Sequence, residues 1–439
     1  MKKLFSEYGM LLVLAALCLL FSSLTLKKEG AMGSGGIEQM VEEVRGLAEP
    51  DTVILVVGAK NKDSENFASE VASRLSGQGF GDVREVLGSP RELRIAWDDW
   101  KTEGVLPGVI VAGGDVLKWT VLESIVDEHS GTRLLFPSDR WQSDFLKPSN
   151  LVAIVDRIVV IAVIAIGMTL VILTGGIDLS VGSLIAFAAV LSTLVMKAMG
   201  GLEAPWWVVW LGFLVAILAC GGIGAGGGFL VAQFKVAPFI TTLAVMMMAR
   251  GFAFLLTGGF SIYQVPESLT WLGQGKTVGV PNTVILLVIL YTSAHLFMSH
   301  TRWGRYIYAV GGNEEAARLS GVPVKGVIFF VYIVAGLCAG FGGCIQASQL
   351  GSGAPNLGMM FELYVIAAVV VGGTSLSGGS GKIFGTLIGA FIISVIQNGM
   401  NLLGFDSYLQ QVVLGAVILV AVLLDKFRQS GKGLAFLNR

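Results

Sequence analysis

Long apolar runs constrain the fold of this chain more than any other feature of its sequence. A helix needs about 20 apolar residues to cross the hydrocarbon core of a membrane, and ten runs approach that length. They lie at residues 9–26, 151–173, 181–199, 206–233, 237–257, 282–299, 326–349, 361–375, 383–399 and 409–425. Only 14% of the 439 residues are charged, against about a quarter in soluble domains. The sequence therefore predicts an all-α polytopic membrane protein with about ten transmembrane helices.

A charged block interrupts this pattern near the N-terminus. Residues 27–147 hold 35 of the 61 Lys, Arg, Asp and Glu residues, 21 of them acidic and 14 basic. Short apolar segments alternate there with amphipathic helical patterns, which is typical of a small parallel sheet covered by helices. The expected strands are 52–58, 82–87, 108–114 and 132–137, and the expected helices are 37–48, 64–77, 90–104 and 115–129. We therefore expect a soluble α/β domain over residues 36–141.

Two loops of this domain follow expected strands, GAKNKDSEN at 58–66 and AGGD at 112–115. Open α/β sheets bind ligands at the carboxyl ends of their strands, so both loops are candidate ligand sites. Neither has the glycine spacing of a nucleotide-binding loop. We favour the simpler interpretation that they are turns leading into helices.

Basic residues in the short loops predict the orientation of the spans, because cytoplasmic loops carry the excess of Lys and Arg. An even number of spans places both termini on one side. That side carries twelve basic residues: Lys2, Lys3, Lys235, Arg302, Arg305, Arg318, Lys325, Lys382, Lys426, Arg428, Lys432 and Arg439. The short loops of the other side carry only Lys197 and Lys276. We therefore expect cytoplasmic termini, including a tail at 429–439, and an extracytoplasmic 36–141 domain.

The first apolar run also resembles the charged and apolar regions of a secretory signal. No convincing cleavage site of small residues follows it. We therefore interpret residues 1–28 as a retained transmembrane anchor helix.

Catalytic and metal-binding patterns are not found in the sequence. The four cysteines lie in apolar runs without CxxC spacing and the three histidines are scattered, so neither a disulfide framework nor a metal site is expected. The stretch GTSLSGGSGKI at 373–383 lacks the first glycine and the last hydroxyl residue of an ATP-binding loop. We expect no enzyme activity, no cofactor and no nucleic-acid partner.

The segment TRWGRYIYAVGGNEEAARLSGVPVKG, residues 301–326, lies between two spans on the basic side. Asn313 is a good N-cap and Gly321 a good terminator, so a short, exposed helix is expected between them. Such a helix is a contact for a partner protein. The alternative is an ordinary amphipathic helix at the membrane interface.

Several motifs together resemble those of the permeases of ribose-type ABC sugar importers. They are AIGMTLVILTGGIDLSVGS, APFITTLAVMMMARGFAFLLTGG, GRYIYAVGGNEEAARLSGV, FELYVIAAVVVGGTSLSGGSGKIFGTLIGA and QNGMNLLGFDSYLQ. They occur in family order over residues 145–428, which identifies that range as the permease domain. The sequence departs from the family in the domain inserted after the first span, in Gly227 where Asn is common, and in Tyr364 where Asp is common.

The resemblance implies partners and a coupling site. It implies a homodimeric pore in a bacterial inner membrane, a cytoplasmic ATPase with two nucleotide-binding halves, and a periplasmic solute-binding protein. It also implies that a coupling helix at 313–320 lies in a groove of the ATPase. The residues carried over are Asn313, Glu314, Glu315, Ala316, Ala317, Arg318, Leu319 and Ser320, with the two glutamates and the arginine as charged contacts.

Polar residues within the spans are candidates for a solute pathway. Arg250 is the cation inside a span, where such residues are functional by default, and Glu362 is expected at similar depth. We predict that they pair or that both face a watery vestibule. The alternative for Arg250 is snorkelling to the outer interface. Thr241 and Thr242 are further polar candidates in the same span.

The stretch TGGIDLSVGS, residues 174–183, joins two apolar runs. Each run is long enough to cross alone, so we expect their junction at the cytoplasmic ends. Gly175 and Gly176 would make the turn after Thr174, and Asp178 or Ser180 would cap the next helix. The alternatives are that Asp178 lines the pore or faces the ATPase.

The glycines of CGGIGAGGG, residues 220–228, include two pairs at GxxxG spacing, which permits close approach of helices. We expect internal packing of these glycines, with a contact between two copies of the chain as the alternative.

The sequence thus predicts the permease subunit of an ATP-driven importer for a monosaccharide or similar small polar solute. A membrane-anchored receptor that senses a ligand through the 36–141 domain is one alternative. Others are a permease for a nucleoside or a branched-chain amino acid, and an ion-coupled transporter. The particular solute cannot be inferred, because sugar specificity in such systems lies largely with the binding protein.

Overall fold

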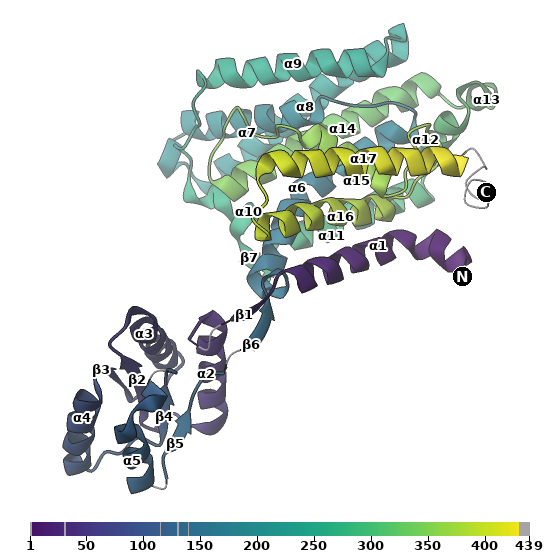
Figure 1. Ribbon diagram of the computed structural model, residues 1–439. Helices are drawn as coiled ribbons and strands as arrows, with labels where there is room; N and C mark the ends of the chain where they lie inside the picture. Colours follow the sequence, from purple (N-terminus) through teal and green to yellow (C-terminus); the bar gives the residue numbers. More distant parts are fainter. Residues whose placement is uncertain (1, 30–31, 115, 130, 139, 430–439) are drawn as a thin grey trace. The chain divides into compact units, whose positions relative to one another are not determined.

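The computed structural model describes residues 2–29, 32–114, 116–129, 131–138 and 140–429. The chain divides into two compact units, one made of residues 1–24 with 147–439 and the other of residues 25–146 (Figure 1). Residues 430–439 of the predicted tail and Asp115 of the predicted AGGD loop lie outside the described residues. The first unit is called the helical unit below, and the second the α/β unit.

The helical unit consists of helices of very different length. They are α1 (Lys2–Leu24), α6 (Pro148–Leu173), α7 (Val181–Ala198), α8 (Trp206–Phe234), α9 (Pro238–Thr257), α10 (Trp271–Gln274), α11 (Asn282–His300), α12 (Arg302–Gly312), α13 (Glu314–Leu319), α14 (Val324–Leu350), α15 (Phe361–Val371), α16 (Ile383–Leu402) and α17 (Ser407–Gln429). Short 3-10 helices, η3 (Gly201–Glu203) and η4 (Glu267–Thr270), and a small hairpin of β7 (Lys276–Thr277) and β8 (Val280–Pro281) complete it.

Within the described residues, seven helices are long and apolar enough to cross a membrane, namely α6, α7, α8, α9, α11, α14 and α16. The apolar parts of the other three predicted spans are shorter, and they lie at 9–24, 361–371 and 407–423. Figure 1 shows the start of α1, the end of α17 and α13 at the same end of this unit.

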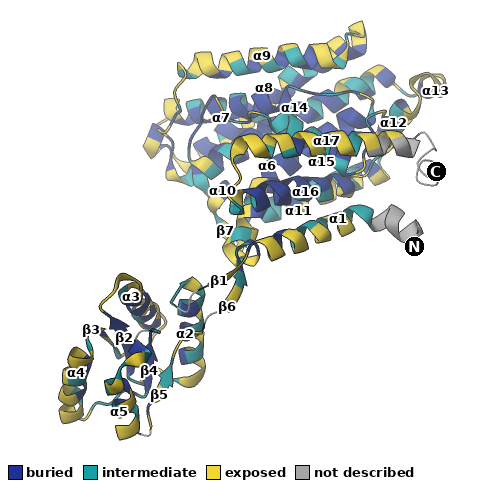
Figure 2. Ribbon diagram, in the orientation of Figure 1, coloured by how far each residue is buried: buried dark blue, intermediate teal, exposed yellow. Residues whose placement is uncertain are grey.

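Helix α14 lies at the centre of the helical unit and packs against α6, α7 and α8. Small residues allow this close approach. A Cβ on Gly224 of α8 would lie 2.3 Å from the Tyr332 carbonyl oxygen of α14, and one on Gly336 of α14 would lie 2.3 Å from the Cys220 carbonyl oxygen of α8. Helices α6 and α16 are mostly buried, whereas less than a third of α9 and of α11 is buried (Figure 2).

Helix α15 corrects the prediction of a span over residues 361–375. It ends at Val371, and its 11 residues rise only about 16 Å at 1.5 Å per residue, which is about half of a hydrocarbon core. Gly373, with a φ of 84°, ends it in a conformation that favours glycine. Half of the residues of the preceding loop, 351–360, are buried. Non-helical backbone of this kind is tolerated at membrane depth where protein surrounds it.

The α/β unit contains a four-stranded parallel sheet. Its strands, in spatial order, are β3 (Val83–Gly88), β2 (Ile54–Ala59), β4 (Val109–Ala112) and β5 (Arg133–Leu135). Helices α2 (Ser34–Leu47) and α3 (Lys62–Gly77) contribute to the core on one face, and α4 (Pro90–Glu103) and α5 (Thr120–Glu128) to the core on the other. The four predicted strands and four predicted helices are present, with boundaries that differ by a few residues.

Alternation along the central strand explains this two-sided core. Ile54 and Val56 of β2 pack with the cluster of α2 and α3, whereas Leu55 and Val57 pack with the cluster of α4 and α5. Successive side chains of a strand point to opposite faces. All four are fully buried, as expected for a parallel sheet covered on both sides.

A ribbon that the sequence analysis did not predict closes the α/β unit. Strand β1 (Leu26–Glu29) pairs antiparallel with β6 (Arg140–Ser143). The Thr25 and Ser143 hydroxyl oxygens lie 3.0 Å apart, and the Lys27 ammonium lies 3.1 Å from the Asp144 carboxylate. The unit therefore extends over 25–146 rather than 36–141, and its two ends meet, which suits a domain inserted into another chain segment.

Candidate functional site

Helix α6 ends in a Schellman motif formed by the first residues of TGGIDLSVGS. The Gly176 amide donates to the Val171 carbonyl oxygen at 3.0 Å, and the Gly175 amide to that of Ile172 at 2.9 Å. Gly175 has a φ of 80°, a conformation that glycine adopts without steric cost. The turn predicted at these two glycines is present, and the Thr174 hydroxyl also bonds back to the Val171 carbonyl.

Asp178 is buried, with 2% of its surface exposed. Its Oδ1 accepts hydrogen bonds from the Ser180 amide at 2.8 Å and from the Ser180 hydroxyl at 2.6 Å. Asp178 thus satisfies one of the free amides at the start of α7. The alternative in which Ser180 caps the helix with its own side chain is wrong, because that hydroxyl donates to Asp178 and accepts from no helix amide among the described residues.

The sequence analysis predicted that the junction between α6 and α7 lies at the ends of both helices. The contacts of this junction in the structure differ from that prediction. The Ile177 carbonyl accepts a bond from the Thr242 hydroxyl, near the start of α9, at 3.3 Å. The Leu184 carbonyl, only four residues into α7, accepts one from the Cys220 thiol at 3.7 Å. Cys220 lies in the middle of α8. Residues 177–180 therefore run inward, and α7 begins inside the helical unit.

Arg250 holds three backbone carbonyls together. Its guanidinium donates to the Pro355 oxygen at 2.8 Å, to the Leu357 oxygen at 2.6 Å and to the Gly182 oxygen at 3.3 Å. These contacts join α9 to the 351–360 loop and to the start of α7. We call this arrangement the Arg250 clasp. These backbone partners favour the clasp over snorkelling of Arg250 to the outer interface.

Glu362 approaches the same place without pairing directly with Arg250. No ion pair joins the two among the described side chains. Instead, both side chains converge on Gly182, where an added Cβ would clash with the Glu362 carboxylate and lie 2.6 Å from the Gly358 carbonyl oxygen. The direct pair is therefore not found, and both residues are partly exposed. Gly182 leaves the space that the carboxylate occupies.

Thr241 and Thr242 are buried. Their hydroxyls bond to carbonyls of the preceding turn, that of Thr241 to Ala237 and that of Thr242 to Pro238. The further bond from Thr242 to Ile177 makes this side chain part of the junction described above. Neither hydroxyl lines a described cavity.

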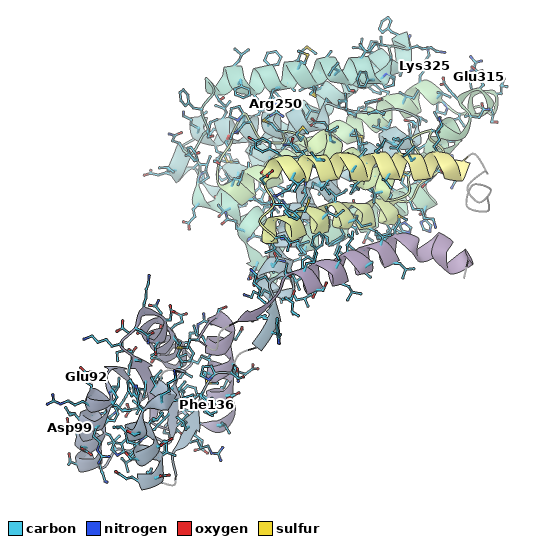
Figure 3. The ribbon with its side chains drawn as sticks, viewed as in Figure 1. Glu92, Asp99, Phe136, Arg250, Glu315 and Lys325 are labelled. Atoms are coloured by element: carbon cyan, nitrogen blue, oxygen red, sulfur yellow. The ribbon has the colours of Figure 1, made fainter. Side chains whose placement is uncertain are left out.

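The predicted helix after Asn313 is present as α13, six residues long. The Asn313 side chain caps it by accepting from the Ala316 amide at 2.9 Å, and Glu315 pairs with Arg318 within the helix. Ala317 is buried, whereas Leu319 is 84% exposed. Figure 3 places Glu315 at the outer edge of the helical unit.

Helix α12, which precedes α13, was not predicted. The Thr301 hydroxyl caps it by accepting from the Gly304 amide at 3.1 Å. The Tyr308 hydroxyl of α12 donates a hydrogen bond to the Gly381 carbonyl. Gly311 of the same helix lies against the Leu173 carbonyl at the end of α6. Helix α12 thus connects α13 to the ends of the spans. Thr301 as a cap, with the amphipathic pattern after it, was the sequence signal that could have predicted α12.

A polar cavity of about 400 Å³ lies at the other end of α14 from α13. We call it the chamber. It is formed by the start of α6, the end of α14, the start of α15, the end of α16 and the start of α17. Its lining residues are Arg157, Ile161, Gln346, Gln349, Met359, Phe361, Tyr364, Gln397, Asn401, Ser407 and Gln410. Sequence reasoning missed the chamber, although five amide side chains at the ends of apolar runs were a visible signal.

The loops of the α/β unit serve as turns. Asn61 caps α3 by accepting from the Ser64 amide, and Ser64 accepts from the Ala59 amide at 2.8 Å. Gly113, after β4, lies against the side chains of Met32 and Ser64, so side chains of the unit itself pack against this strand end.

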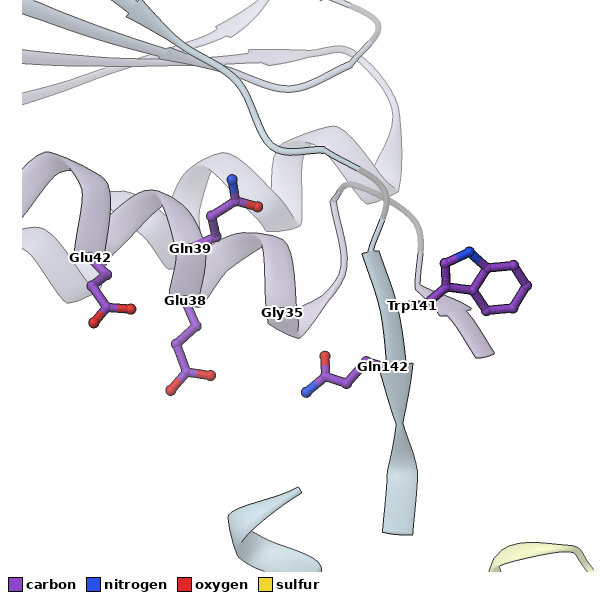
Figure 4. Close-up of a pocket in the computed structure, with 6 residues that line it drawn as sticks. All are labelled: Gly35, Glu38, Gln39, Glu42, Trp141 and Gln142. Carbon is purple, nitrogen blue, oxygen red and sulfur yellow. The ribbon is translucent and has the colours of Figure 1, made fainter. Parts of the chain in front are cut away.

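The α/β unit has a hollow of about 360 Å³. It is lined by Gly35, Glu38, Gln39, Glu42, Trp141 and Gln142. Its side chains do not converge: the Trp141 indole points away from α2, and Gln39 points away from Glu38 (Figure 4). Within the described residues, no group of three His, Cys, Asp or Glu side chains is arranged to hold a metal ion.

Seven long apolar helices, a capped helix exposed at one end and a polar chamber at the other are the architecture of a multi-pass membrane permease. The family model described as a branched-chain amino acid transport system permease component matches residues 150–422. The chain therefore belongs to this permease family. It is a transport subunit rather than an enzyme.

Three relatives match this chain over most of their own length. The ribose import permease protein RbsC of Escherichia coli strain K12 is 44% identical over 291 residues, 65% of this chain and 88% of the relative. That of Bacillus subtilis strain 168 is 42% identical over 284 residues, 64% and 86% of the two chains. The L-arabinose transport system permease protein AraH of E. coli K12 is 38% identical over 269 residues, 61% and 80%. No solved structure matches the chain significantly.

Proposed function

We propose that this chain is the transmembrane subunit of an ATP-driven ABC importer for a monosaccharide or a similar small polar solute. ATP is hydrolysed by a separate cytoplasmic protein with two nucleotide-binding halves, and a solute-binding protein delivers the sugar. The names of the ribose and L-arabinose relatives support a sugar rather than a nucleoside or a branched-chain amino acid. The α13 helix is the single observation that carries the coupling to an ATPase.

Helix α13 has the form of a docking element. Leu319 is 84% exposed at the end of α13, and burying an apolar side chain of this size against a partner contributes about 1.5–3 kcal/mol. Ala317 on the opposite side fixes the helix to its own unit. Glu315 and Arg318 neutralise each other, so we place the apolar tip, with Glu314 beside it, in the groove of the ATPase.

We propose ten spans in a bacterial inner membrane, with the seven long helices joined by α1, by α15 together with the 351–360 loop, and by α17. The Lys- and Arg-rich loops place α13 and both termini in the cytoplasm. The α/β unit is then extracytoplasmic. It contributes to docking of the binding protein, which deletion of residues 26–143 would test: uptake should fall while the ATPase still assembles, and unchanged uptake would contradict this role.

We propose that two copies of the chain form the pore. Gly224 and Gly228 pack internally against α14, whereas Gly222 and Gly226 have no neighbour within 4 Å of an added Cβ. The second GxxxG pair therefore leaves a smooth strip on the outer side of α8, which supports a contact with another copy.

Association with the ATPase tests the proposal. The chain is co-expressed with an ABC-importer ATPase that has two nucleotide-binding halves, and the complex is purified by a tag on the permease. We expect stoichiometric ATPase with the wild type and at least a tenfold loss with Leu319→Glu, because a carboxylate cannot enter an apolar groove without a partner. Leu202→Glu is the matched control, since Leu202 in η3 is 69% exposed at a different loop. Equal ATPase recovery with both variants would contradict docking through α13.

A further inference from the structure

We infer that the chamber is a transit site for a neutral, hydroxyl-rich solute, with Gln346 and Gln397 as the groups that bind it. This inference rests on the proposed import function and assigns it a place and a solute class. The chamber's volume of about 400 Å³ lies within the range of about 300–1,000 Å³ found for small-molecule sites.

The amides of Gln346 and Gln397 are the first reason. Both residues line the chamber, and Gln397 is 7% exposed. Neither side chain makes a hydrogen bond to another described residue. Because a buried amide without a partner is costly, Gln397 needs water or a solute in the chamber, and the half-buried Gln346 lines the same space. Each amide offers two donors and an acceptor, which matches hydroxyl groups that both donate and accept.

The rest of the wall is held in place by its own contacts. Gln349 donates to the Asp156 carbonyl at 2.7 Å, and Gln410 donates to the Asn401 side chain at 2.6 Å and to the Phe405 carbonyl at 2.9 Å. These amides are therefore already used in fixing α14 and α17. Only Gln346 and Gln397 are left free for a solute among the glutamines that line the chamber.

Two aromatic rings add a surface for the apolar side of a sugar. Phe361 and Tyr364 lie edge to face, with centroids 5.9 Å apart, at the start of α15. Polar groups that converge beside aromatic rings are typical of small-molecule sites. A larger cavity of about 520 Å³ between α6, α11 and α14 is lined almost entirely by apolar side chains. Polarity rather than size therefore distinguishes the chamber.

The charges of the chamber select the solute class. Arg157 is its one charged lining residue, and no carboxylate lines it among the described residues. An amino acid carries an ammonium group that would have no counter-charge there, whereas a neutral sugar needs none. The chamber thus favours a monosaccharide over the branched-chain amino acids named in the description of the family.

Uptake by the complete transporter, reconstituted in vesicles with its ATPase and binding protein, tests this inference. The solutes are radiolabelled ribose, L-arabinose and leucine, and the variant is Gln346→Leu with Gln397→Leu. We expect sugar uptake to fall at least about tenfold, a few-fold for each lost hydrogen bond, while ATP hydrolysis by the assembled complex stays within about twofold. The control is Gln264→Leu, an exposed glutamine that does not line the chamber.

A second measurement covers the case in which the double variant fails to fold. Gln397→Cys is treated with a hydrophilic thiol reagent, and Gln264→Cys serves as the control in the same background. Block of sugar uptake in Gln397→Cys alone supports the inference, and unchanged uptake after labelling overturns it. Leucine uptake that depends on the two glutamines would overturn the solute class. If the wild type imports neither sugar, the proposed function itself fails, whatever the variants do.

Discussion

Replacing Arg250 removes the contacts that hold the 351–360 loop inside the helical unit. Arg250→Ala deletes three hydrogen bonds to backbone carbonyls, two of them 2.8 Å or shorter. A hydrogen bond to a charged group contributes about 1.5–3 kcal/mol. The two short bonds therefore stabilise the closed loop by about 3–6 kcal/mol. This is a large share of the 5–15 kcal/mol by which typical proteins are stable.

Hydrogen exchange measured by mass spectrometry detects this loss of stability in the 351–360 loop itself. A cost of 3 kcal/mol corresponds to about a 100-fold change in an opening equilibrium, since 1.4 kcal/mol is tenfold. We expect peptides covering residues 351–361 to exchange at least about 100-fold faster in Arg250→Ala. Arg250→Lys should lie between, because an ammonium group cannot reproduce the planar fork of a guanidinium. The control is Arg302→Ala, an exposed arginine at the start of α12.

Unchanged exchange at residues 351–361 in Arg250→Ala would refute the clasp. A double-mutant cycle with Glu362→Gln separates the clasp from an ion pair. Because Arg250 and Glu362 both lie beside Gly182 but form no ion pair among the described side chains, we expect a coupling energy in the lower half of the range of about 0.5–3 kcal/mol found for residues with a shared partner. A coupling near the top of that range would favour the direct pair that the sequence analysis gave as one of two alternatives.

Two further predictions concern packing and pH. Gly224→Ala should destabilise the protein by about 1–3 kcal/mol because its Cβ would meet the Tyr332 carbonyl at 2.3 Å, as in other overpacked sites. Gly415→Ala in α17, where an added Cβ has no neighbour within 4 Å, should leave the thermal midpoint in detergent unchanged or raised; an equal fall in both variants would contradict the packing described. In the α/β unit, the Ser89 amide and hydroxyl lower the pKa of the Glu92 carboxyl. Because the pKa of Glu92 is lower in the folded protein, its ionised carboxylate stabilises α4 at pH values above the usual Glu pKa of about 4.3. This stabilisation is lost as the pH falls through the lowered pKa. The protection of the amides at the start of α4, measured relative to intrinsic exchange at each pH, should therefore fall on acidification, and fall less in Glu92→Gln.

The apolar runs were enough to predict most helices of the helical unit. Burial in lipid or protein demands long apolar segments, and the boundaries of α6, α9 and α14 follow them to within about three residues. The same logic failed for α15, because FELYVIAAVVV continues the apolar pattern through a glycine turn. The contact of Arg250 with the 351–360 loop joins residues more than 100 positions apart, and no local pattern reveals it.

The α/β unit shows the same difference between local features, which the sequence predicts, and long-range contacts, which it does not. Its strands and helices have strong local patterns, so alternation of Ile54–Val57 and the caps of α3 and α4 could be predicted in kind. The β1–β6 ribbon could not, because LKKE and RWQS are short and mixed in character. Only their pairing across more than 100 residues makes them strands.

The candidate site was predicted unevenly for a related reason. The Asn313 cap and the exposed helix after it are local features, and both are present in α13. The inward course of residues 177–180 depends on contacts with α8 and α9, which neighbouring residues do not encode. The chamber depends on amides from α14, α16 and α17 that meet only in the folded protein.

ATP-driven uptake tests the central claim most directly. The permease is reconstituted in vesicles with its ATPase and binding protein, ATP is enclosed inside, and labelled ribose and L-arabinose are added outside with the binding protein. We predict accumulation of at least one sugar against its gradient that requires ATP and is lost in Leu319→Glu. Accumulation without ATP, or undiminished accumulation in Leu319→Glu, would contradict an importer coupled through α13.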